Sequence, residues 1–368
     1  MAKAEKASKS KMKKSTRRRG KLGVAIVGCG KVAGGHARGW LKCRRPVEIR
    51  ALVDVVPEHA EKLGSSHKLT KARVLTDYRE VLADSEIDIV DICAYSDLHT
   101  EMIAASLEAG KHILTEKPVG YSLEECRRHR YLRRKYPKPV VAVAYSLRYY
   151  PTNVSAKKEI NSGTIGRPMY ASIVHNHPHR CENVFERRLG ERVGSDSGGR
   201  YIAGSEMTHV THPFDFARYV LGEADDVFCY HQKYGYFAMI RHTNGALSQV
   251  IGATAATGGQ STPYVLCVQG TKGTLFTYRV PDGRDYLAGT YRGHVIVGGR
   301  KRDFTPKNPE TGHADVSRCR NFADAILKGT PLICDMLDAV RTSELLHALR
   351  DSHDHEIRVP VHHADQTG

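Results

Sequence analysis

Residues 23–33 read GVAIVGCGKVA, and this stretch determines how the first part of the chain is interpreted. The run from Val24 to Val27 is apolar and β-branched, which predicts a buried strand. It ends in Gly28-Cys29-Gly30-Lys31-Val32-Ala33, a G-x-G-x-x-A pattern that opens a helix. In such a turn the first glycine permits a tight bend, the second lets the backbone approach a pyrophosphate, and the small third residue lets helix and strand pack closely. The N–H groups at the start of the helix would then face the phosphates. The pattern predicts a dinucleotide-binding turn, and a Gly-rich turn of another doubly wound fold is the alternative.

The chain around this turn alternates between short β-rich runs and helix-like segments as far as residue 146. Such an alternation predicts a parallel sheet with helices on both faces, the doubly wound Rossmann arrangement of the α/β class. Strands are expected at Val24–Val27, Glu48–Val53, Arg73–Leu75, Ile87–Cys93, His112–Thr115 and Val140–Ala144. Helices are expected near 31–42, 58–66, 77–83, 98–109 and 122–135.

The end of the second expected strand bears on the choice of cofactor. The run EIRALVD ends in Asp54. A carboxylate at this position can hydrogen-bond the ribose hydroxyls of NAD, and it would repel the 2′-phosphate of NADP. Val55 and Val56 follow, in place of an arginine that could hold that phosphate. The sequence therefore favours NAD, with NADP as the alternative.

The pattern changes after about residue 150, where longer alternating runs predict an antiparallel sheet. Its strands are expected at 169–177, 226–233, 236–242, 246–253, 264–269 and 273–278, and helices at 152–161, 207–220, 313–328 and 336–351. We divide the chain into a disordered basic tail over 1–21, a Rossmann domain over 22–147, and an α/β domain with a large open, mainly antiparallel sheet over 148–368.

The composition of the chain bears on a membrane segment, on the redox compartment and on binding of nucleic acid. The 368 residues include no apolar run long enough to span a bilayer, so no membrane segment is expected. Nine scattered cysteines without a CxxC pair are typical of buried free thiols in a reducing compartment, which favours the cytoplasm. The formal charge of +16 is concentrated in residues 1–21, where ten Lys and Arg face one Glu. Binding of nucleic acid through that tail is the weaker alternative to a solvated, disordered segment.

Residues 112–122 read HILTEKPVGYS, so that Glu116, Lys117 and Pro118 follow the fifth expected strand. Ligands of open α/β sheets bind beyond the carboxyl ends of the strands, which would place Lys117 beside a bound cofactor. A lysine there can give a proton to a carbonyl oxygen as hydride arrives, or take it in the reverse direction, and partial burial would lower its pKa. A solvated loop with a turn proline is the alternative that EKP on its own favours.

A second candidate for proton transfer lies in GSEMTHVTHPFDFARYVLG, residues 204–222, which predicts a loop that enters an amphipathic helix. His209, His212 and Asp215 are spaced i, i+3 and i+6, so neighbours in the series lie roughly on one face. A neutral histidine can accept a proton at pH 7. Asp215 is interpreted as a structural hydrogen-bonding partner, and His209 on its own is typical of a surface or core residue.

Taken in order, the G-x-G-x-x-A strand, Asp54, EKP and H-x-x-D resemble the glucose–fructose oxidoreductase / inositol dehydrogenase / rhizopine-catabolism (Gfo/Idh/MocA) family over residues 22–360. Supporting stretches are DLHTEMIAASLEAGKHILTEKP (97–118), SLRYYPTN (146–153), NSGTIGRP (161–168), HPFDFARYVLGE (212–223) and SRCRNFADAILKGTPLI (317–333). The resemblance implies a Rossmann domain, followed by an open sheet that often mediates dimers or tetramers. It also implies NAD(P)-dependent oxidation or reduction of sugars, sugar nucleotides or cyclitols.

The resemblance also assigns residues. It implies that Lys117 and His212 are catalytic, and that Arg148 and Tyr149 lie in the segment that closes over the nicotinamide and substrate. The predicted cofactor-binding residues are Gly28, Gly30, Lys31, Val32, Ala33, Asp54, Ser96, His99, Glu116, Lys117 and Arg148. The predicted substrate-binding residues are Lys117, Tyr149, His177, Thr208, His209 and His212.

Two positions depart from the family pattern. Many inositol dehydrogenase-like members carry an Asp four residues before the catalytic His, where this chain has Thr208. A threonine can hydrogen-bond a hydroxyl but cannot ionise usefully, which puts the proton relay of an inositol dehydrogenase in doubt. Ser96-Asp97-Leu98-His99 stands where members often have Thr-Pro ahead of the His, and this is expected to alter the cofactor-side loop only slightly.

A metal site is the alternative for HNHPHRCE, residues 175–182. Every second residue from His175 is a potential zinc ligand, namely His175, His177, His179 and Cys181. In one straight strand these ligands would spread over about 20 Å, too far to close one tetrahedron without a sharp bend. We therefore predict no metal and assign this stretch to structure or to the substrate pocket.

The sequence thus predicts an NAD-dependent oxidoreductase that moves hydride between nicotinamide and a secondary hydroxyl or ketone of a sugar, sugar derivative or cyclitol, acting as a homodimer or homotetramer. One alternative is a glycoside-processing enzyme that uses bound NAD without net redox. Another is an NAD-binding sensor or regulator, against which the presence of both Lys117 and His212 argues.

Overall fold

The computed structural model describes residues 20–176, 205–232, 235–253, 264–281, 289–307 and 314–362. The predicted basic tail lies almost wholly outside the described residues, and so does the long polar loop 179–200. The fold and the site below concern the described residues.

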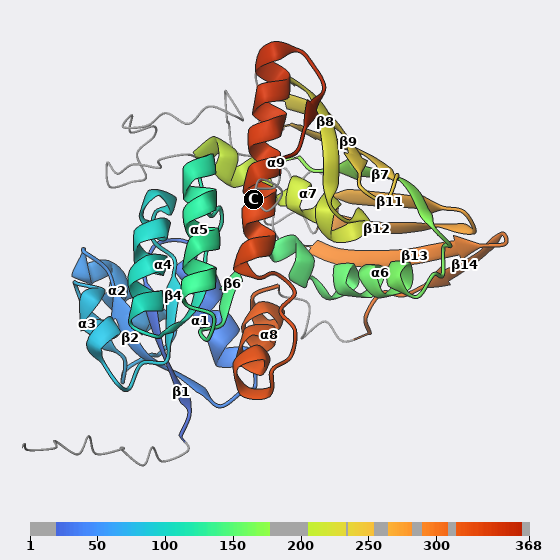
Figure 1. Cartoon of the computed structure of the whole chain (residues 1–368). Helices are drawn as coiled ribbons and strands as arrows, with labels where there is room; N and C mark the ends of the chain where they lie inside the picture. Colours follow the sequence, from blue (N-terminus) through green and yellow to red (C-terminus); the bar gives the residue numbers. More distant parts are fainter. Residues whose placement is uncertain are drawn as a thin grey trace, which may run out of the picture.

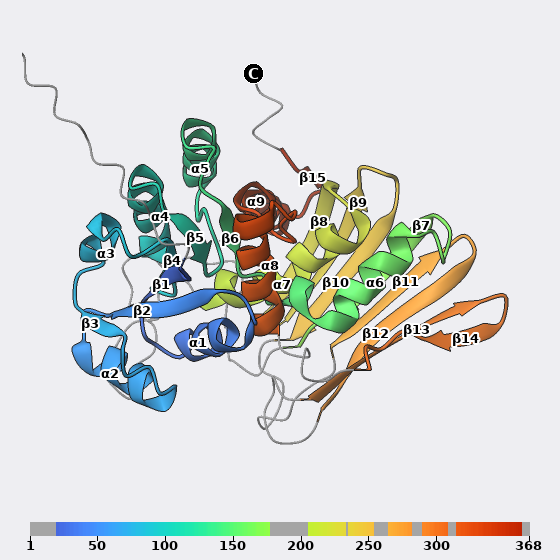
Figure 2. The same cartoon turned by 90° about the horizontal axis from the view of Figure 1, so that it is seen from below.

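The first part of the chain forms a six-stranded parallel sheet in the order β3-β2-β1-β4-β5-β6 (Figures 1 and 2). Its strands are β1 (Leu22–Val27), β2 (Val47–Val53), β3 (Arg73–Leu75), β4 (Ile89–Ile92), β5 (His112–Thr115) and β6 (Val141–Val143). Along β1, Val24 and Ile26 belong to the core on one face, and Ala25 and Val27 to the core on the other. Both faces are therefore buried, which is why β1 is apolar along its length. This confirms the predicted Rossmann sheet.

Helices connect these strands and cover both faces of the sheet. They are α1 (Ala33–Lys42), α2 (Pro57–Ser66), α3 (Arg79–Ala83), α4 (His99–Glu108) and α5 (Leu123–Lys135), with short 3₁₀ turns at Ser96–Leu98 and Ser146–Tyr149. Helix α5 begins with a capping box in which the Ser122 hydroxyl accepts from the Glu125 N–H at 3.1 Å, and the Glu125 carboxylate accepts from the Ser122 N–H at 3.2 Å. The same carboxylate accepts from the Tyr121 N–H at 2.7 Å, so the loop after the EKP stretch ends at a fixed place.

The second part of the chain forms a nine-stranded sheet in the order β14-β13-β12-β11-β7-β10-β9-β8-β15. Neighbouring strands are antiparallel except β7 and β10, which run parallel. The strands are β7 (Pro168–Val174), β8 (Ala224–Gln232), β9 (Gly235–His242), β10 (Leu247–Ala253), β11 (Val265–Gly270), β12 (Gly273–Pro281), β13 (Gly289–Val297), β14 (Arg300–Asp303) and β15 (Val359–Pro360). The predicted large, mainly antiparallel sheet is confirmed, although β13 and β14 were not predicted.

One face of this sheet is covered by helices α6 (Pro151–Asn161), α7 (Ser205–Leu221) and α9 (Met336–His355), as Figure 2 shows. Alternate strand residues, such as Ala171 and Ile173 on β7 and Leu266 and Val268 on β11, point into the core beneath these helices. The described helices leave the opposite face of the sheet uncovered (Figures 1 and 2).

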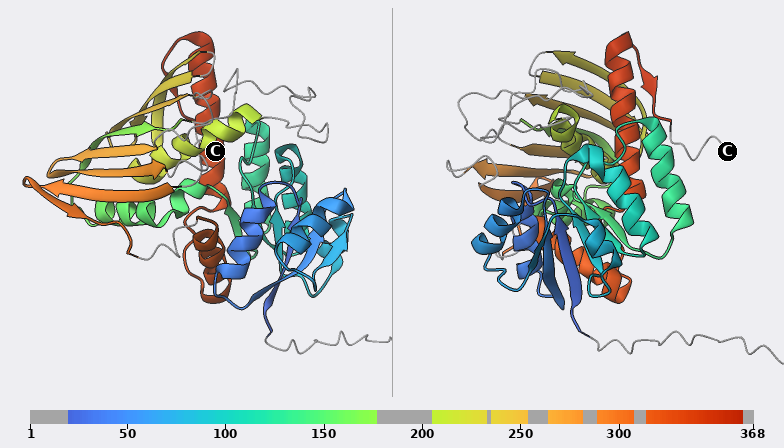
Figure 3. Two further views of the ribbon diagram at one scale, coloured as in Figure 1. Left: turned by 180° about the vertical axis from the view of Figure 1, so that it is seen from behind. Right: turned by 90° about the vertical axis from the view of Figure 1, so that its left-hand side faces the viewer.

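The last two helices return to the first sheet (Figure 3). Helix α8 (Ala314–Lys328) packs against α1, where a Cβ on Gly39 would lie 2.7 Å from the Asp315 carbonyl oxygen, so only glycine permits this approach. Phe322 of α8 shares a core with β1. Helix α9 spans both cores: Val340 packs with the parallel sheet and Leu345 with the nine-stranded sheet. Part of the segment assigned to the second domain from sequence therefore packs on the first sheet.

All eight described cysteines are free thiols, and all but Cys267 are buried. This is the thiol usage that the spacing of the cysteines predicts. Across the described helices, none combines the length and the apolar character that crossing a membrane requires.

Candidate active site

The turn after β1 has the geometry of a phosphate cradle. Gly28 adopts φ +88°, and a Cβ there would lie 2.6 Å from the backbone nitrogen of Ala94, so the position requires glycine. At Gly30 a Cβ would meet no heavy atom within 4 Å, which leaves open space beside the backbone. Lys31 and Val32 are exposed, whereas Ala33 is buried where α1 begins. No described side chain caps the start of α1, where the N–H groups of Ala33 and Gly35 donate to the carbonyl oxygens of Gly30 and Val32 at 3.2 and 3.0 Å.

Asp54 lies beside the cradle at the carboxyl end of β2. Its Oδ2 accepts from the Cys29 N–H at 2.8 Å and its Oδ1 from the Val56 N–H at 3.0 Å, while His59 Nδ1 lies 3.4 Å from Oδ1. These contacts hold the carboxylate at the mouth of the turn, and its second lone pairs remain to accept from ribose hydroxyls. The Asp54 carboxylate thus fits the adenosine ribose of NAD, and the open space beside Gly30 fits the pyrophosphate.

The EKP stretch emerges where β5 ends. The Glu116 N–H donates to the Ile92 carbonyl at 2.8 Å, which keeps the loop beside the end of β4, and the Lys117–Pro118 peptide is cis. Lys117 is partly buried. Burial lowers the pKa of Lys117, while the charge of Glu116 acts to raise it. The direction is the one that we expected from the sequence, toward a value at which the amine can exchange protons.

His99, predicted to contact the cofactor, is buried between two loops, and its contact with the cofactor stays a prediction. It is 1% exposed, and its Nε2 and Nδ1 lie 3.1 Å from the carbonyl oxygens of Ala94 and Pro118. The ring therefore joins the loop after β4 to the EKP loop. Ser96, also predicted to bind the cofactor, is hydrogen-bonded to the Tyr121 hydroxyl in the same pair of loops.

Arg148 and Tyr149, predicted to contact cofactor and substrate, are both buried. Arg148 is 2% exposed, and its Nε and Nη2 donate to the Asp215 carboxylate at 2.8 and 2.7 Å. Its Nη1 donates to Asp338 at 2.8 Å. Tyr149 is fully buried in a core of the parallel sheet. Because carboxylates of α7 and α9 occupy its guanidinium, Arg148 fastens the turn after β6 to these two helices. The contacts of Arg148 and Tyr149 with cofactor and substrate stay predictions. Asp215 is a structural partner, as predicted.

Helix α7 brings His212 to the end of β6. The hydroxyl groups of Tyr145 and Thr211 are hydrogen-bonded at 2.8 Å, and the rings of Tyr145 and His212 meet edge to face with centroids 6.0 Å apart. Strands β5 and β6 are neighbours, and Lys117 and Tyr145 each lie two residues beyond the end of their strand. Lys117 and the segment that carries His212 therefore lie at the carboxyl ends of neighbouring strands.

Other predicted substrate residues fall where side chains are not described. Thr208 and His209 lie within α7. His177 lies outside the described residues, and so do His179 and Cys181 of the stretch considered as a metal site. Their roles stay predictions.

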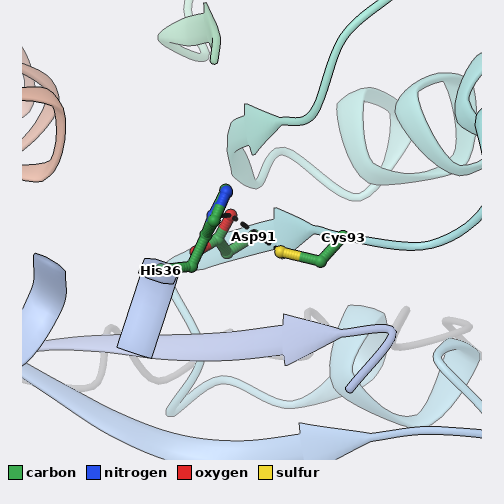
Figure 4. Close-up of side chains that lie close together, drawn as sticks. All are labelled: His36, Asp91 and Cys93. Carbon is green, nitrogen blue, oxygen red and sulfur yellow. Dashed lines mark hydrogen bonds and ion pairs between the residues drawn. The ribbon is translucent and has the colours of Figure 1, made fainter. Parts of the chain in front are cut away.

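Sequence reasoning missed a buried polar network behind Lys117. His36 of α1 is 1% exposed; its Nδ1 lies 2.7 Å from Asp91 Oδ1, and its Nε2 lies 3.0 Å from Glu116 Oε1. Figure 4 shows His36 and Asp91 pointing toward each other from α1 and β4. The indole N–H of Trp40 donates to the other Asp91 oxygen at 2.6 Å. A charged residue inside the apolar run IVDI was the signal that could have indicated this network.

Within the described residues, His36, Asp91 and Cys93 are the one group of ligand-type side chains close enough together to suggest a metal. Both Asp91 oxygens already accept hydrogen bonds, and the cation of Arg318 acts on the same group from α8. The donor set therefore fits a hydrogen-bonded ion pair better than a cation site.

The fold and the cradle define an NAD-binding Rossmann protein with a second, sheet-containing domain. A family model described as "Oxidoreductase family, NAD-binding Rossmann fold" matches residues 22–145, and the model of the Gfo/Idh/MocA C-terminal domain matches residues 154–276. The chain belongs to the Gfo/Idh/MocA family, as its sequence motifs predicted.

Individual relatives match this chain at low sequence identity and over only part of its length. The uncharacterized oxidoreductase YrbE of Bacillus subtilis is 29% identical over 199 residues, which cover 54% of this chain and 53% of YrbE. An inositol 2-dehydrogenase/D-chiro-inositol 3-dehydrogenase of Lactiplantibacillus plantarum is 31% identical over 165 residues, 45% of this chain and 47% of that protein. The chain thus spans about half the length of the curated relatives it matches. A levoglucosan dehydrogenase solved with NADH and levoglucosan superposes with a TM-score of 0.76 at 22% identity, over 93% of this chain and 99% of that one, which shows the shared fold.

Proposed function

We propose that this protein is an NAD-dependent oxidoreductase that transfers hydride between nicotinamide and a secondary hydroxyl or ketone of a sugar, sugar derivative or cyclitol. The observation that carries the proposal is that the phosphate cradle and a partly buried lysine, Lys117, both follow the carboxyl ends of strands in one parallel sheet. Relatives named for inositol and levoglucosan support the substrate class.

The residues of the cradle would bind the cofactor by backbone and carboxylate contacts. Gly28 and Gly30 would let the backbone approach the pyrophosphate, and the positive end of the α1 dipole would favour its charge. Asp54 would accept from the ribose hydroxyls, which favours NAD over NADP. Bound NAD would supply the hydride acceptor next to the substrate carbon.

Lys117 would handle the hydroxyl proton. Its pKa, lowered by burial, makes the neutral amine accessible as a base when the alcohol is oxidised, and the ammonium form returns the proton in reduction. His212 would share this task or orient the hydroxyl, since its helix reaches the same edge of the sheet.

A spectrophotometric assay tests the proposal. The protein is mixed with NAD and a panel of sugars, sugar nucleotides and cyclitols, and the absorbance of reduced nicotinamide is followed. Lys117→Ala should lower the rate on the true substrate by about 10²- to 10⁴-fold. Lys157→Ala is the matched control, because Lys157 is another partly buried lysine whose pKa burial lowers, and it lies on α6. Full activity in Lys117→Ala would refute the role of this lysine.

We also propose that the protein assembles into a homodimer or homotetramer through the uncovered face of the nine-stranded sheet. Outward-pointing apolar side chains on this face are exposed, namely Tyr230, Met239, Leu247 and Val280. Exposed apolar side chains on an uncovered sheet face favour a protein interface. Light scattering should give a multiple of the chain mass, and Leu247→Glu should reduce it.

A further inference from the structure

We propose that His36 is a positioning residue for Lys117, and that it acts by holding the Glu116 carboxylate between its own ring and the Lys117 backbone. The inference rests on the proposed role of Lys117 and assigns a task to a histidine that lies on the cofactor-binding helix, outside the proton-transfer pair.

The contacts of His36 require a doubly protonated ring. Each ring nitrogen lies within hydrogen-bond distance of a carboxylate oxygen, Asp91 on one side and Glu116 on the other. An ionised carboxylate only accepts, so both nitrogens must donate, and only the imidazolium has two N–H groups. Burial and the nearby Arg318 act to lower the pKa of His36, yet the Asp91 carboxylate holds it well above its ordinary value.

Glu116 is held from two directions. One oxygen lies 3.0 Å from the His36 ring, and the other accepts from the Lys117 backbone N–H at 3.2 Å. Burial acts to raise the pKa of Glu116, but the hydrogen bond from His36 and the charges of Lys117 and His36 hold it well below its ordinary value. A fixed, ionised carboxylate thus orients the peptide that carries the lysine.

The anchor of this arrangement is buried. Asp91 is fully buried, and its second oxygen is occupied by Trp40, so Asp91 holds the far side of the His36 ring in place. Titratable groups also face the cluster from Cys93 after β4 and from Arg318, Asp315 and Cys319 on α8, where Arg318 pairs with Asp315 at 3.3 Å. Because the acceptors come from β4 and the EKP loop, the His36 ring fastens the helix of the phosphate cradle to the catalytic loop.

The charge of Glu116 has a direct consequence for Lys117. Burial lowers the pKa of Lys117, and Glu116 is the group that opposes this. Without the imidazolium, a buried Glu116 would take up a proton more readily and lose that charge. Replacement of His36 should therefore lower the pKa of Lys117 and loosen its peptide.

The test titrates Lys117 directly in the cofactor-free protein. Trace acetylation with acetic anhydride is carried out at a series of pH values, and the acetylated fraction of Lys117 is read by peptide mass spectrometry. The variants are His36→Gln, Glu116→Gln and the double variant. His242→Gln is the control: His242 is also 1% exposed with both ring nitrogens hydrogen-bonded, to Gly222 O at 2.8 Å and Ser248 Oγ at 2.9 Å, but it lies in the other sheet.

We expect the labelling curve of Lys117 to move to lower pH in His36→Gln and in Glu116→Gln, and to move no further in the double variant, because both changes act through one carboxylate. The control should leave it unchanged. Once a substrate is known, His36→Gln should lower kcat about tenfold while NAD affinity stays within about twofold of the wild type. An unchanged curve in folded His36→Gln, or additive shifts in the double variant, would overturn the proposal.

A second measurement does not depend on whether a His36 variant folds. Imidazole nitrogen NMR of the wild-type protein should report the His36 ring as doubly protonated at pH 8, with the signal assigned by its change in Glu116→Gln; a neutral ring would overturn the proposal. Neither measurement requires substrate or NAD. If Lys117→Ala stays fully active while these results hold, the proposed role of Lys117 fails and the coupling between His36 and Lys117 stands.

Discussion

Replacing Gly30 by alanine should weaken NAD binding without weakening the fold, whereas Gly28→Ala should weaken both. The two glycines lie two residues apart in one turn, but their surroundings differ. At Gly30 a Cβ would meet no heavy atom within 4 Å, and at Gly28 it would lie 2.6 and 2.7 Å from the N and Cα atoms of Ala94.

The magnitudes follow from these distances. Gly28 has φ +88°, where an L-residue costs about 1–2 kcal/mol, and crowding against backbone adds about 1–3 kcal/mol to the loss of stability. At Gly30 neither penalty applies, and alanine should stabilise by about 0.4–1 kcal/mol by restricting the unfolded chain. The added methyl would occupy the space where the pyrophosphate approaches. Loss of one charge-assisted hydrogen bond there is worth about 1.5–3 kcal/mol, or about 10- to 150-fold in the dissociation constant.

Urea denaturation of the cofactor-free proteins measures the first effect, and titration with NAD followed by calorimetry measures the second. We expect Gly30→Ala to be at least as stable as the wild type and to bind NAD at least about tenfold more weakly. If Gly30→Ala bound NAD as the wild type does, or if Gly28→Ala were as stable as Gly30→Ala, the assignment of this turn as the phosphate cradle would be refuted.

Four further outcomes are expected. Arg148→Met leaves Asp215 buried without its bidentate partner, so the free energy of unfolding in urea should fall by about 3–5 kcal/mol; a loss under 1 kcal/mol would show that the pair is not important. Initial rates of oxidation should rise with pH through the pKa of Lys117, which burial has lowered, because only the neutral amine accepts a proton; a flat profile would argue for another base. Asp54→Ser should shift the ratio of NADP to NAD affinity toward NADP by about tenfold, since a repelling carboxylate is lost, and an unchanged ratio would contradict this. Burial raises the pKa of Cys93 to about 12, so iodoacetamide at pH 8 should modify this thiol only in denaturant, as peptide mass spectrometry can check.

The sequence predicted the parallel sheet well because β1, β4 and β6 are largely apolar and the turns after β1 and β5 carry recognisable motifs. The strands at Arg73–Leu75 and His112–Thr115 have the expected bounds. It missed β13 and β14, where glycine, arginine and histidine interrupt the apolar alternation, and where pairing with β12 supplies the order that local pattern does not.

The candidate site was predictable only where its residues follow strand ends. Lys117 and Asp54 could be found in this way, because the direction of a parallel strand fixes the edge at which the next residue lies. The ion pairs of Arg148 could not be predicted, since its partners Asp215 and Asp338 are 67 and 190 residues away in the chain. His36 was missed for the same reason: Glu116, 80 residues further on, gives it a role that its own helix does not reveal.

Helix α9 has a consequence for any attempt to exchange cofactor domains between relatives. Its first turns complete one core and its later turns the other, and α8 also packs on the parallel sheet. A recombinant graft that ended at residue 147 would leave behind the surface that Phe322 and Val340 fill. A functional chimera would therefore have to carry residues 314–340 along with 20–147, as two separate pieces of one chain, and its crossover within α9 would have to fall between Val340 and Leu345.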